Sequence, residues 1–123
     1  DRSRGLGDVY KRQDFYENPQ HLPFLFKMSD SEKAAYANFA KKMLADALSS
    51  SYDVIVLDEF LDVISLFEPD FVNSLSFSPE KEYVITGHAE YAPLFEKADY
   101  ITEFKNVRHP YEKGIAARRG IEF

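Results

Sequence analysis

The chain has 123 residues, of which 45% are hydrophobic and none is cysteine, and its formal net charge is −6. The acidic balance argues against a nonspecific nucleic-acid binder, and the absence of cysteine excludes disulfides and thiolate metal sites. No apolar run approaches the roughly 20 residues of a membrane span. We therefore expect one domain that is soluble and cytoplasmic, with small molecules or proteins as partners, no nucleic acid and no membrane.

The first thirteen residues, "DRSRGLGDVYKRQ", show no periodicity that connects them to the rest of the chain. Residues 3–13 resemble the translation of a transposase sequencing adapter, one frame of which gives "DVYKRQ". We expect residues 1–13 to be a non-native, adapter-derived segment and residues 14–123 to hold the domain. An ordinary flexible terminus is the alternative.

The first half of the domain predicts a helix followed by a strand. Ser29-Asp30-Ser31-Glu32 has the spacing of a capping box, so a helix should begin there, and the serines at 49–51 should end it. Its expected apolar stripe, at three- and four-residue steps, is Tyr36, Phe39, Ala40, Met43, Leu44 and Ala47. The next run, 54–57, is apolar at every position and predicts a strand buried on both faces.

The second half alternates in the same way. A short amphipathic segment at 60–66 precedes a helix that starts near Pro69. We then expect a strand at 83–86, a helix at 89–97 and a third strand at 100–104. This alternation predicts an α/β fold, with a three-layer parallel sheet carrying helices on both faces, and nothing divides the chain into two domains.

Polar residues follow the first two predicted strands, at the edge where ligands of parallel sheets bind. Asp58 and Glu59 end the first strand, and Thr86-Gly87-His88 ends the second. An apolar strand that ends in two acids resembles a Walker B element, whose carboxylate binds Mg²⁺ on phosphate oxygens. The alternative, that one acid caps the next helix, is equally open on the residues alone.

The histidines and the tail give weaker signals. No histidine pair has the spacing of a zinc site, which argues against zinc at His21, His88 and His109. The tail from Lys105 is basic and turn-rich. Its spacing favours a solvated extension, and a clamp for phosphate or carboxylate is the sharper alternative.

Four segments in order, "YDVIVLDEF", "EYVITGH", "ADYITEF" and "RHPYEKGIAARRGIEF", resemble the C-terminal two-thirds of the P-loop type of ATP:corrinoid adenosyltransferases. The tail is the most specific part, and the resemblance covers about residues 23–123. It implies a P-loop NTPase (RecA-like) fold and a homodimeric enzyme of cobalamin synthesis or salvage. Such an enzyme transfers the 5′-deoxyadenosyl group of ATP to the cobalt of reduced corrinoid, cob(I)alamin. It uses Mg²⁺, and a reductase such as a flavoprotein supplies Co(I).

The resemblance also implies roles for individual residues. Glu59, and with it Asp58, matches the acids expected to bind Mg²⁺, and Phe24 and Phe26 resemble an aromatic pair below the corrin ring, with ordinary core aromatics as the alternative. His88 stands where the family commonly has arginine, and a neutral histidine cannot replace a guanidinium fork. The implied nucleotide contacts are Asp58, Glu59, Thr86, Gly87, His88, His109 and Arg118.

The family's glycine-rich phosphate loop has no counterpart in this sequence. We therefore expect the N-terminal strand and phosphate loop to be missing, and the chain to be a fragment that is inactive alone. The runner-up interpretation is a noncatalytic nucleotide-binding or interaction module with a P-loop-like fold. A RecA-like motor ranks third, because that class gives no account of the tail.

Overall fold

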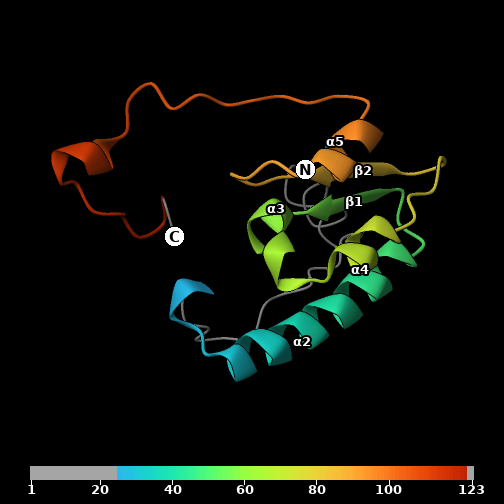
Figure 1. The fold of residues 1–123 in the computed structure, drawn as a ribbon. Coiled ribbons are helices and arrows are strands. Elements are labelled where there is room, and N and C mark those ends of the chain that lie inside the picture. The colour runs from blue at the N-terminus through green and yellow to red at the C-terminus, as the bar shows by residue number, and fades with distance from the viewer. Residues whose placement is uncertain (1–24, 122–123) are drawn as a thin grey trace, which may run out of the picture. The chain divides into compact units, whose positions relative to one another are not determined.

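The computed structural model describes residues 25–121 (Figure 1). The chain divides into two compact units, Asp1–Ala92 and Pro93–Phe123. The expectation of one domain over residues 14–123 stays a prediction. The second unit contains a stretch, 98–109, that has no helix or strand and whose side chains are exposed. No helix among residues 25–121 is long and apolar enough to cross a membrane.

The first long helix, α2, spans Asp30–Leu48 and begins at the predicted capping box. The Ser29 hydroxyl accepts the Glu32 backbone N–H at 3.2 Å, and the Glu32 carboxylate accepts the Ser29 N–H at 3.1 Å. At the other end the Ser50 hydroxyl donates to the carbonyl of Ala47 at 2.7 Å, which satisfies a terminal acceptor. Both predicted ends of the helix are confirmed.

Replacement of Ser29 by alanine is expected to lower the free energy of unfolding by about 1 kcal/mol, because the Glu32 N–H loses its acceptor. Urea denaturation followed by circular dichroism measures the change. Ser51→Ala is the control, since Ser51 is exposed beyond the helix end. Equal midpoints for the two variants would contradict the capping role.

The buried face of α2 consists of Ala37, Ala40, Leu44 and Ala47. The predicted stripe is right for the last three of these, but Phe39 is wrong, since its side chain is 40% exposed. The buried residues follow a 3-4-3 spacing that starts at Ala37, and Phe39 lies off this line on the flank of the helix. Small alanines on the buried line allow neighbouring elements to approach closely.

The sheet has two parallel strands, β1 (Val54–Leu57) and β2 (Glu82–Ile85), with Val56 opposite Val84. Both predicted strands and their parallel pairing are confirmed, the second one residue earlier than expected. The expected burial of β1 on both faces is wrong. Ile55 is buried, whereas Val54 and Val56 are 55% and 59% exposed.

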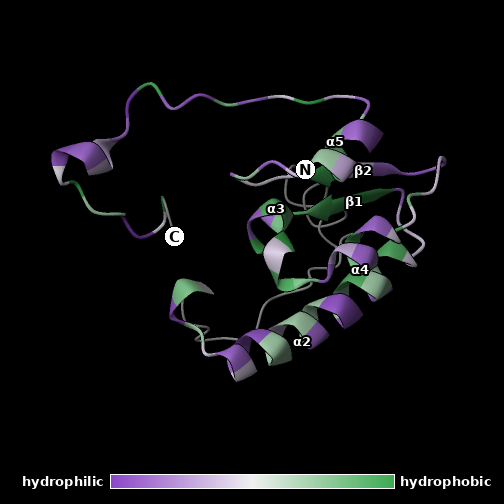
Figure 2. Cartoon of the chain, viewed as in Figure 1, coloured by the Kyte–Doolittle hydropathy of each residue, from purple (hydrophilic) through white to green (hydrophobic). Residues whose placement is uncertain are grey.

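The exposed face of the sheet is nonetheless apolar, and Figure 2 shows β1 coloured as hydrophobic along its length. Val54, Val56 and Val84 share this face by strand alternation and register. No described element of the first unit covers it. An apolar run therefore predicted a strand suited to burial on both faces, while the described chain buries only one.

The connection between the strands supplies part of the core. It contains α3 (Phe60–Val63), the 3-10 turn η2 (Ile64–Leu66) and α4 (Pro69–Asn73), which begins with the predicted proline in its first turn. The ring of Phe67 lies 6.0 Å from that of Phe60 and 5.3 Å from that of Phe71, centroid to centroid. Lys41 of α2 lies over the Phe71 ring at 4.9 Å, so α2 and α4 are neighbours (Figure 1).

The second unit contains most of α5 (Ala92–Lys97) and the 3-10 turn η3 (Pro110–Lys113). The helix predicted from residue 89 starts at Ala92, because an earlier start would require Pro93 to donate an N–H that it lacks. The predicted third strand at 100–104 is wrong. Tyr100 and Phe104 are 93% and 92% exposed, and strand pairing in residues 25–121 is confined to β1 and β2, which leaves this segment without a hydrogen-bonding neighbour.

Candidate functional site

The carboxyl ends of β1 and β2 bring together residues that are 27 and 28 positions apart in the chain. The Thr86 N–H donates to the Leu57 carbonyl at 3.2 Å, and the Thr86 carbonyl accepts the Leu61 N–H at 3.2 Å. These bonds hold the loop after β2 against the loop after β1 and the first turn of α3. The predicted gathering of Asp58, Glu59, Thr86, Gly87 and His88 at one edge of the sheet is therefore present.

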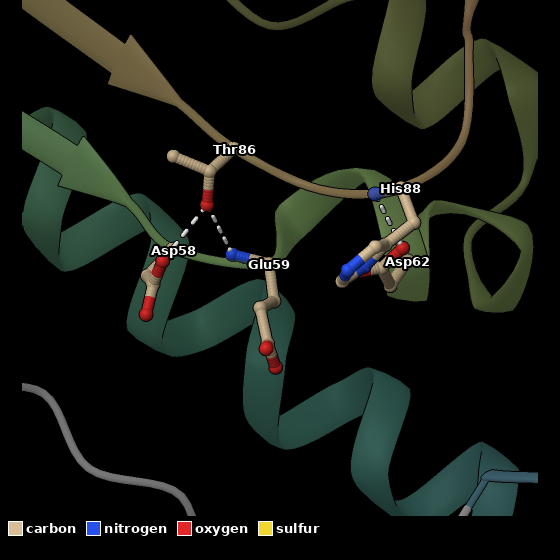
Figure 3. Close-up of polar contacts among 5 residues, drawn as sticks. All are labelled: Asp58, Glu59, Asp62, Thr86 and His88. Atoms are coloured by element: carbon tan, nitrogen blue, oxygen red, sulfur yellow. Dashed lines mark hydrogen bonds and ion pairs between the residues drawn. The ribbon is translucent and has the colours of Figure 1, made fainter. Parts of the chain in front are cut away.

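The Thr86 hydroxyl bonds to the side chain of Asp58 and to the backbone of Glu59 (Figure 3). Its oxygen accepts the backbone N–H of Glu59 at 2.9 Å, and its proton is donated to Asp58 Oδ1 at 2.8 Å. A hydroxyl has one proton to donate, so this arrangement commits it fully. Figure 3 shows both carboxylates extending from the same side of the loop.

Thr86→Val is expected to release this arrangement, because valine keeps the shape of threonine without the hydroxyl. Glu59 N–H then loses its acceptor, and its hydrogen exchange should accelerate about tenfold, which corresponds to about 1.4 kcal/mol of local protection. Nuclear magnetic resonance measures the exchange rate. Thr86→Ser, which keeps the hydroxyl, is the control, and an unchanged rate in the valine variant would contradict the role.

The backbone of Glu59 has φ 54° and ψ 22°, the left-handed conformation, and Glu59 is the non-glycine residue with positive φ in the described range. Such a conformation costs on the order of 1–3 kcal/mol and persists where surrounding contacts impose it. Glu59 precedes the first turn of α3, yet its side chain makes no capping hydrogen bond. The helix-cap alternative therefore fails for Glu59, whose exposed carboxylate is available to a ligand.

Gly87 allows the loop after β2 to pass close to α3. Its φ is 155°, and a Cβ placed on it would lie 2.5 Å from the Cβ of Leu61, far inside van der Waals contact. Only glycine fits this approach without displacing buried Leu61. The close approach delivers the next residue, His88, to the side of α3.

Asp62 binds His88 through two atoms. The His88 backbone N–H donates to Asp62 Oδ1 at 2.8 Å, and His88 Nδ1 lies 3.0 Å from Asp62 Oδ2 (Figure 3). These hydrogen bonds lower the pKa of Asp62, and the side-chain bond and the charge of Asp62 raise the pKa of His88, with a smaller contribution from the charge of Glu59. Our sequence reasoning missed Asp62. Its position one helical turn after the acid pair was the available signal.

The acid pair fits magnesium in the mode that nucleotide sites use. Mg²⁺ prefers oxygen ligands and is commonly held by one or two carboxylates together with waters and substrate phosphates. Asp58 keeps Oδ2 without a hydrogen bond among the described residues, and the Glu59 carboxylate is exposed. No group of three or more histidine or acidic side chains in residues 25–121 forms a complete metal cage. An ion at these two residues would take its remaining ligands from water or from a bound phosphate.

The remaining predicted site residues belong to other elements of the chain. His109 belongs to the second unit, where its Nδ1 accepts the Tyr111 N–H at 3.0 Å and caps η3, and the Arg118 carbonyl accepts the Ile121 N–H. Phe26, in the 3-10 turn η1 (Leu25–Lys27), is 80% exposed, which excludes the ordinary core alternative for this ring. Phe24 lies outside the described residues. The ligand contacts of all these residues stay predictions.

Comparison with known proteins addresses the identity of this sheet edge. The model of the family "ATP:corrinoid adenosyltransferase BtuR/CobO/CobP" matches residues 13–123. The chain belongs to this family. The mixed α/β structure, with its parallel strands and acidic strand end, is therefore that of a member of the corrinoid adenosyltransferase family.

Curated relatives agree with the family match. The chain is 34% identical over 88 residues to a corrinoid adenosyltransferase of Escherichia coli K12, and 30% identical over 87 residues to "Corrinoid adenosyltransferase CobA" of Salmonella typhimurium. Each alignment covers 68% of this chain and 43% of the relative, so the chain spans less than half the length of these corrinoid adenosyltransferases. A Pseudomonas aeruginosa relative is 30% identical over 106 residues, 81% of this chain and 52% of that protein. No solved structure matches significantly.

Proposed function

We propose that this chain carries the magnesium- and nucleotide-binding sheet edge of an enzyme that transfers the 5′-deoxyadenosyl group of ATP to cob(I)alamin. The observation that carries the proposal is the Thr86 hydroxyl, which bonds to the Asp58 carboxylate and to the Glu59 backbone N–H at the carboxyl ends of two parallel strands. A family match over residues 13–123 supports the choice of reaction. The product is adenosylcobalamin, and the enzyme serves its synthesis or salvage.

The reaction forms a bond between cobalt and ribose C5′ and breaks the bond between C5′ and the triphosphate oxygen. Cobalt in cob(I)alamin supplies the electron pair, and the triphosphate leaves with the pair of the broken bond. The protein has to align these atoms and stabilise the charge of the leaving group. Bound Mg²⁺ would neutralise part of that charge, and Asp58 and Glu59 are the residues that would hold it.

Other residues complete the proposed site. The loop at Gly87 brings the backbone after β2 close to α3, beside the acids. Phe24 and Phe26 are proposed to pack below the corrin ring, for which the exposure of Phe26 is suitable. His109 and Arg118 are proposed as further nucleotide contacts from the basic tail.

The wider architecture is proposed on similar grounds. A P-loop fold with helices on both faces of its sheet accounts for the apolar residues Val54, Val56 and Val84 on the exposed face, which a second helical layer would cover.

The full enzyme is proposed to act as a cytoplasmic homodimer with a flavoprotein reductase. The adapter origin of residues 1–13 stays a prediction.

Titration calorimetry with Mg²⁺–ATP tests the proposal. We expect magnesium-dependent binding that Glu59→Gln weakens about tenfold or more and that the exposed control Glu80→Gln leaves unchanged. Cob(II)alamin should bind with a spectral shift toward the four-coordinate state. Binding of neither ligand would overturn the proposal and favour the noncatalytic module, and ATP binding that ignores both magnesium and Glu59 would overturn the metal assignment.

A further inference from the structure

We propose that Asp62 is a positioning residue for the triphosphate of the nucleotide, because it orients the His88 imidazolium so that the outward ring nitrogen, Nε2, donates to a phosphate oxygen. This inference rests on the proposed nucleotide function of the same sheet edge. It assigns a role to a residue outside the predicted site, and it names the chemistry that replaces arginine at position 88.

The geometry fixes both the ring and the loop that carries it. One carboxylate accepts the backbone N–H of His88 at 2.8 Å and faces Nδ1 of the same residue at 3.0 Å. Asp62 is itself fixed, since its own N–H donates to the Glu59 carbonyl at 3.1 Å. The start of α3 and His88 therefore form one connected group, in which a ring held by one hydrogen bond, on a loop held by another, loses little further freedom on ligand binding.

The pair is oriented with the acid inward and the histidine outward. The Asp62 side chain is 31% exposed and the His88 side chain is 88% exposed. With Nδ1 facing Asp62, the other ring nitrogen has no hydrogen bond among residues 25–121. A ring nitrogen presented to solvent beside two strand-end carboxylates is placed to meet a ligand that bridges to the same edge.

The charge state of the ring decides which ligand it can contact. When Nδ1–H donates to Asp62, a neutral imidazole carries only a lone pair at Nε2, which repels phosphate, whereas an imidazolium carries an N–H there as well. The Asp62 side chain raises the pKa of His88 through its hydrogen bond and its charge, and Glu59, which the proposed metal would occupy, adds a smaller contribution in the metal-free chain. Asp62 thus orients the ring and favours the form that donates.

A lone imidazolium N–H differs from an arginine fork in two measurable ways. It makes one hydrogen bond to an anion, and it can no longer donate that hydrogen bond once the ring deprotonates. Because the protonated form binds, affinity for triphosphate should be highest below the pKa of His88 and should fall as pH rises through it. That pKa lies above the ordinary value of 6.5.

Inorganic triphosphate with Mg²⁺ is the probe. It is titrated into the full chain at pH values below and above the pKa of His88, while the His88 ring is followed by nuclear magnetic resonance. We expect the affinity for triphosphate to fall about fivefold or more from the lowest to the highest pH, a change near 1 kcal/mol. Asp62→Asn should move the ring pKa and the affinity midpoint down together. His88→Arg should keep the low-pH affinity and remove the pH dependence. His88→Gln should also remove the pH dependence, and should hold the affinity at the lower, high-pH level.

The outcomes separate this inference from the proposed function. An unchanged pH profile in His88→Gln, or an unchanged ring pKa in Asp62→Asn, overturns the inference while Glu59-dependent Mg²⁺–ATP binding can still stand. A His88-dependent profile without any effect of magnesium or Glu59 overturns the proposed metal site and leaves the anion contact. The His88→Arg variant keeps the test decisive if Asp62→Asn fails to fold, which circular dichroism reveals.

Discussion

Gly87→Ala should lower the free energy of unfolding by about 2–4 kcal/mol, from backbone strain at φ 155° and overpacking against Leu61. The clash meets Cβ of a buried residue, which cannot rotate away as the end of a long side chain could. Relief requires the loop after β2 to move from α3, which breaks the hydrogen bond between Leu61 N–H and the Thr86 carbonyl. Urea denaturation measures the loss of stability.

Gly120→Ala is the matched control for this effect. Gly120 also has positive φ, at 79°, but nothing lies within 4 Å of the position of an added Cβ. Gly120→Ala should therefore lower the free energy of unfolding only through backbone strain, by on the order of 1 kcal/mol. If Gly87→Ala is no more destabilising than Gly120→Ala, the close approach of the loop to α3 is refuted.

Phe67→Ala is expected to cost about 3–5 kcal/mol, enough to unfold most of a marginally stable domain at room temperature. The ring is 6% exposed and contacts the rings of Phe60 and Phe71, which link α3 to α4. Its removal leaves a cavity between elements too short to be stable without tertiary packing. Circular dichroism and urea denaturation give the midpoint, and Phe67→Leu should recover a large part of the stability.

The exposed ring of Phe26 provides the comparison. Phe26→Ala should change the free energy of unfolding by less than about 0.5 kcal/mol, since the ring is 80% exposed. Equal losses for the Phe67 and Phe26 variants would contradict the aromatic core described between α3 and α4. In the proposed enzyme, Phe26→Ala should instead weaken corrinoid binding, so stability and function separate at these two positions.

Local chemistry explains the successes of sequence reasoning. The capping box at Ser29, the serines after Leu48 and the proline at the start of α4 each act within one helical turn, so their residues alone determine the element ends. The run from Val54 to Leu57 determined a strand in the same way. The parallel partner followed because an intervening helical segment is the usual way to connect parallel strands.

Long-range properties explain the failures. Burial of both faces of β1 and strand formation at 100–104 depend on which elements lie beside them, and no window of sequence contains that information. At the site, Asp58 and Glu59 were recognisable because they directly follow a strand. Asp62 was not, because its significance comes from His88, which lies 26 positions away.

The left-handed backbone at Glu59 has a consequence for how this position tolerates variation. Two separate requirements limit which residues can occupy position 59. The left-handed backbone admits glycine, asparagine and aspartate more readily than valine or isoleucine, whereas metal binding would admit only an acid. Replacement of Glu59 by glycine or asparagine therefore removes the charge and relieves the conformational cost of the left-handed backbone. Loss of function and gain in folding stability are expected to coincide at one residue, so thermal stability alone would rank the most damaging replacements here among the most benign.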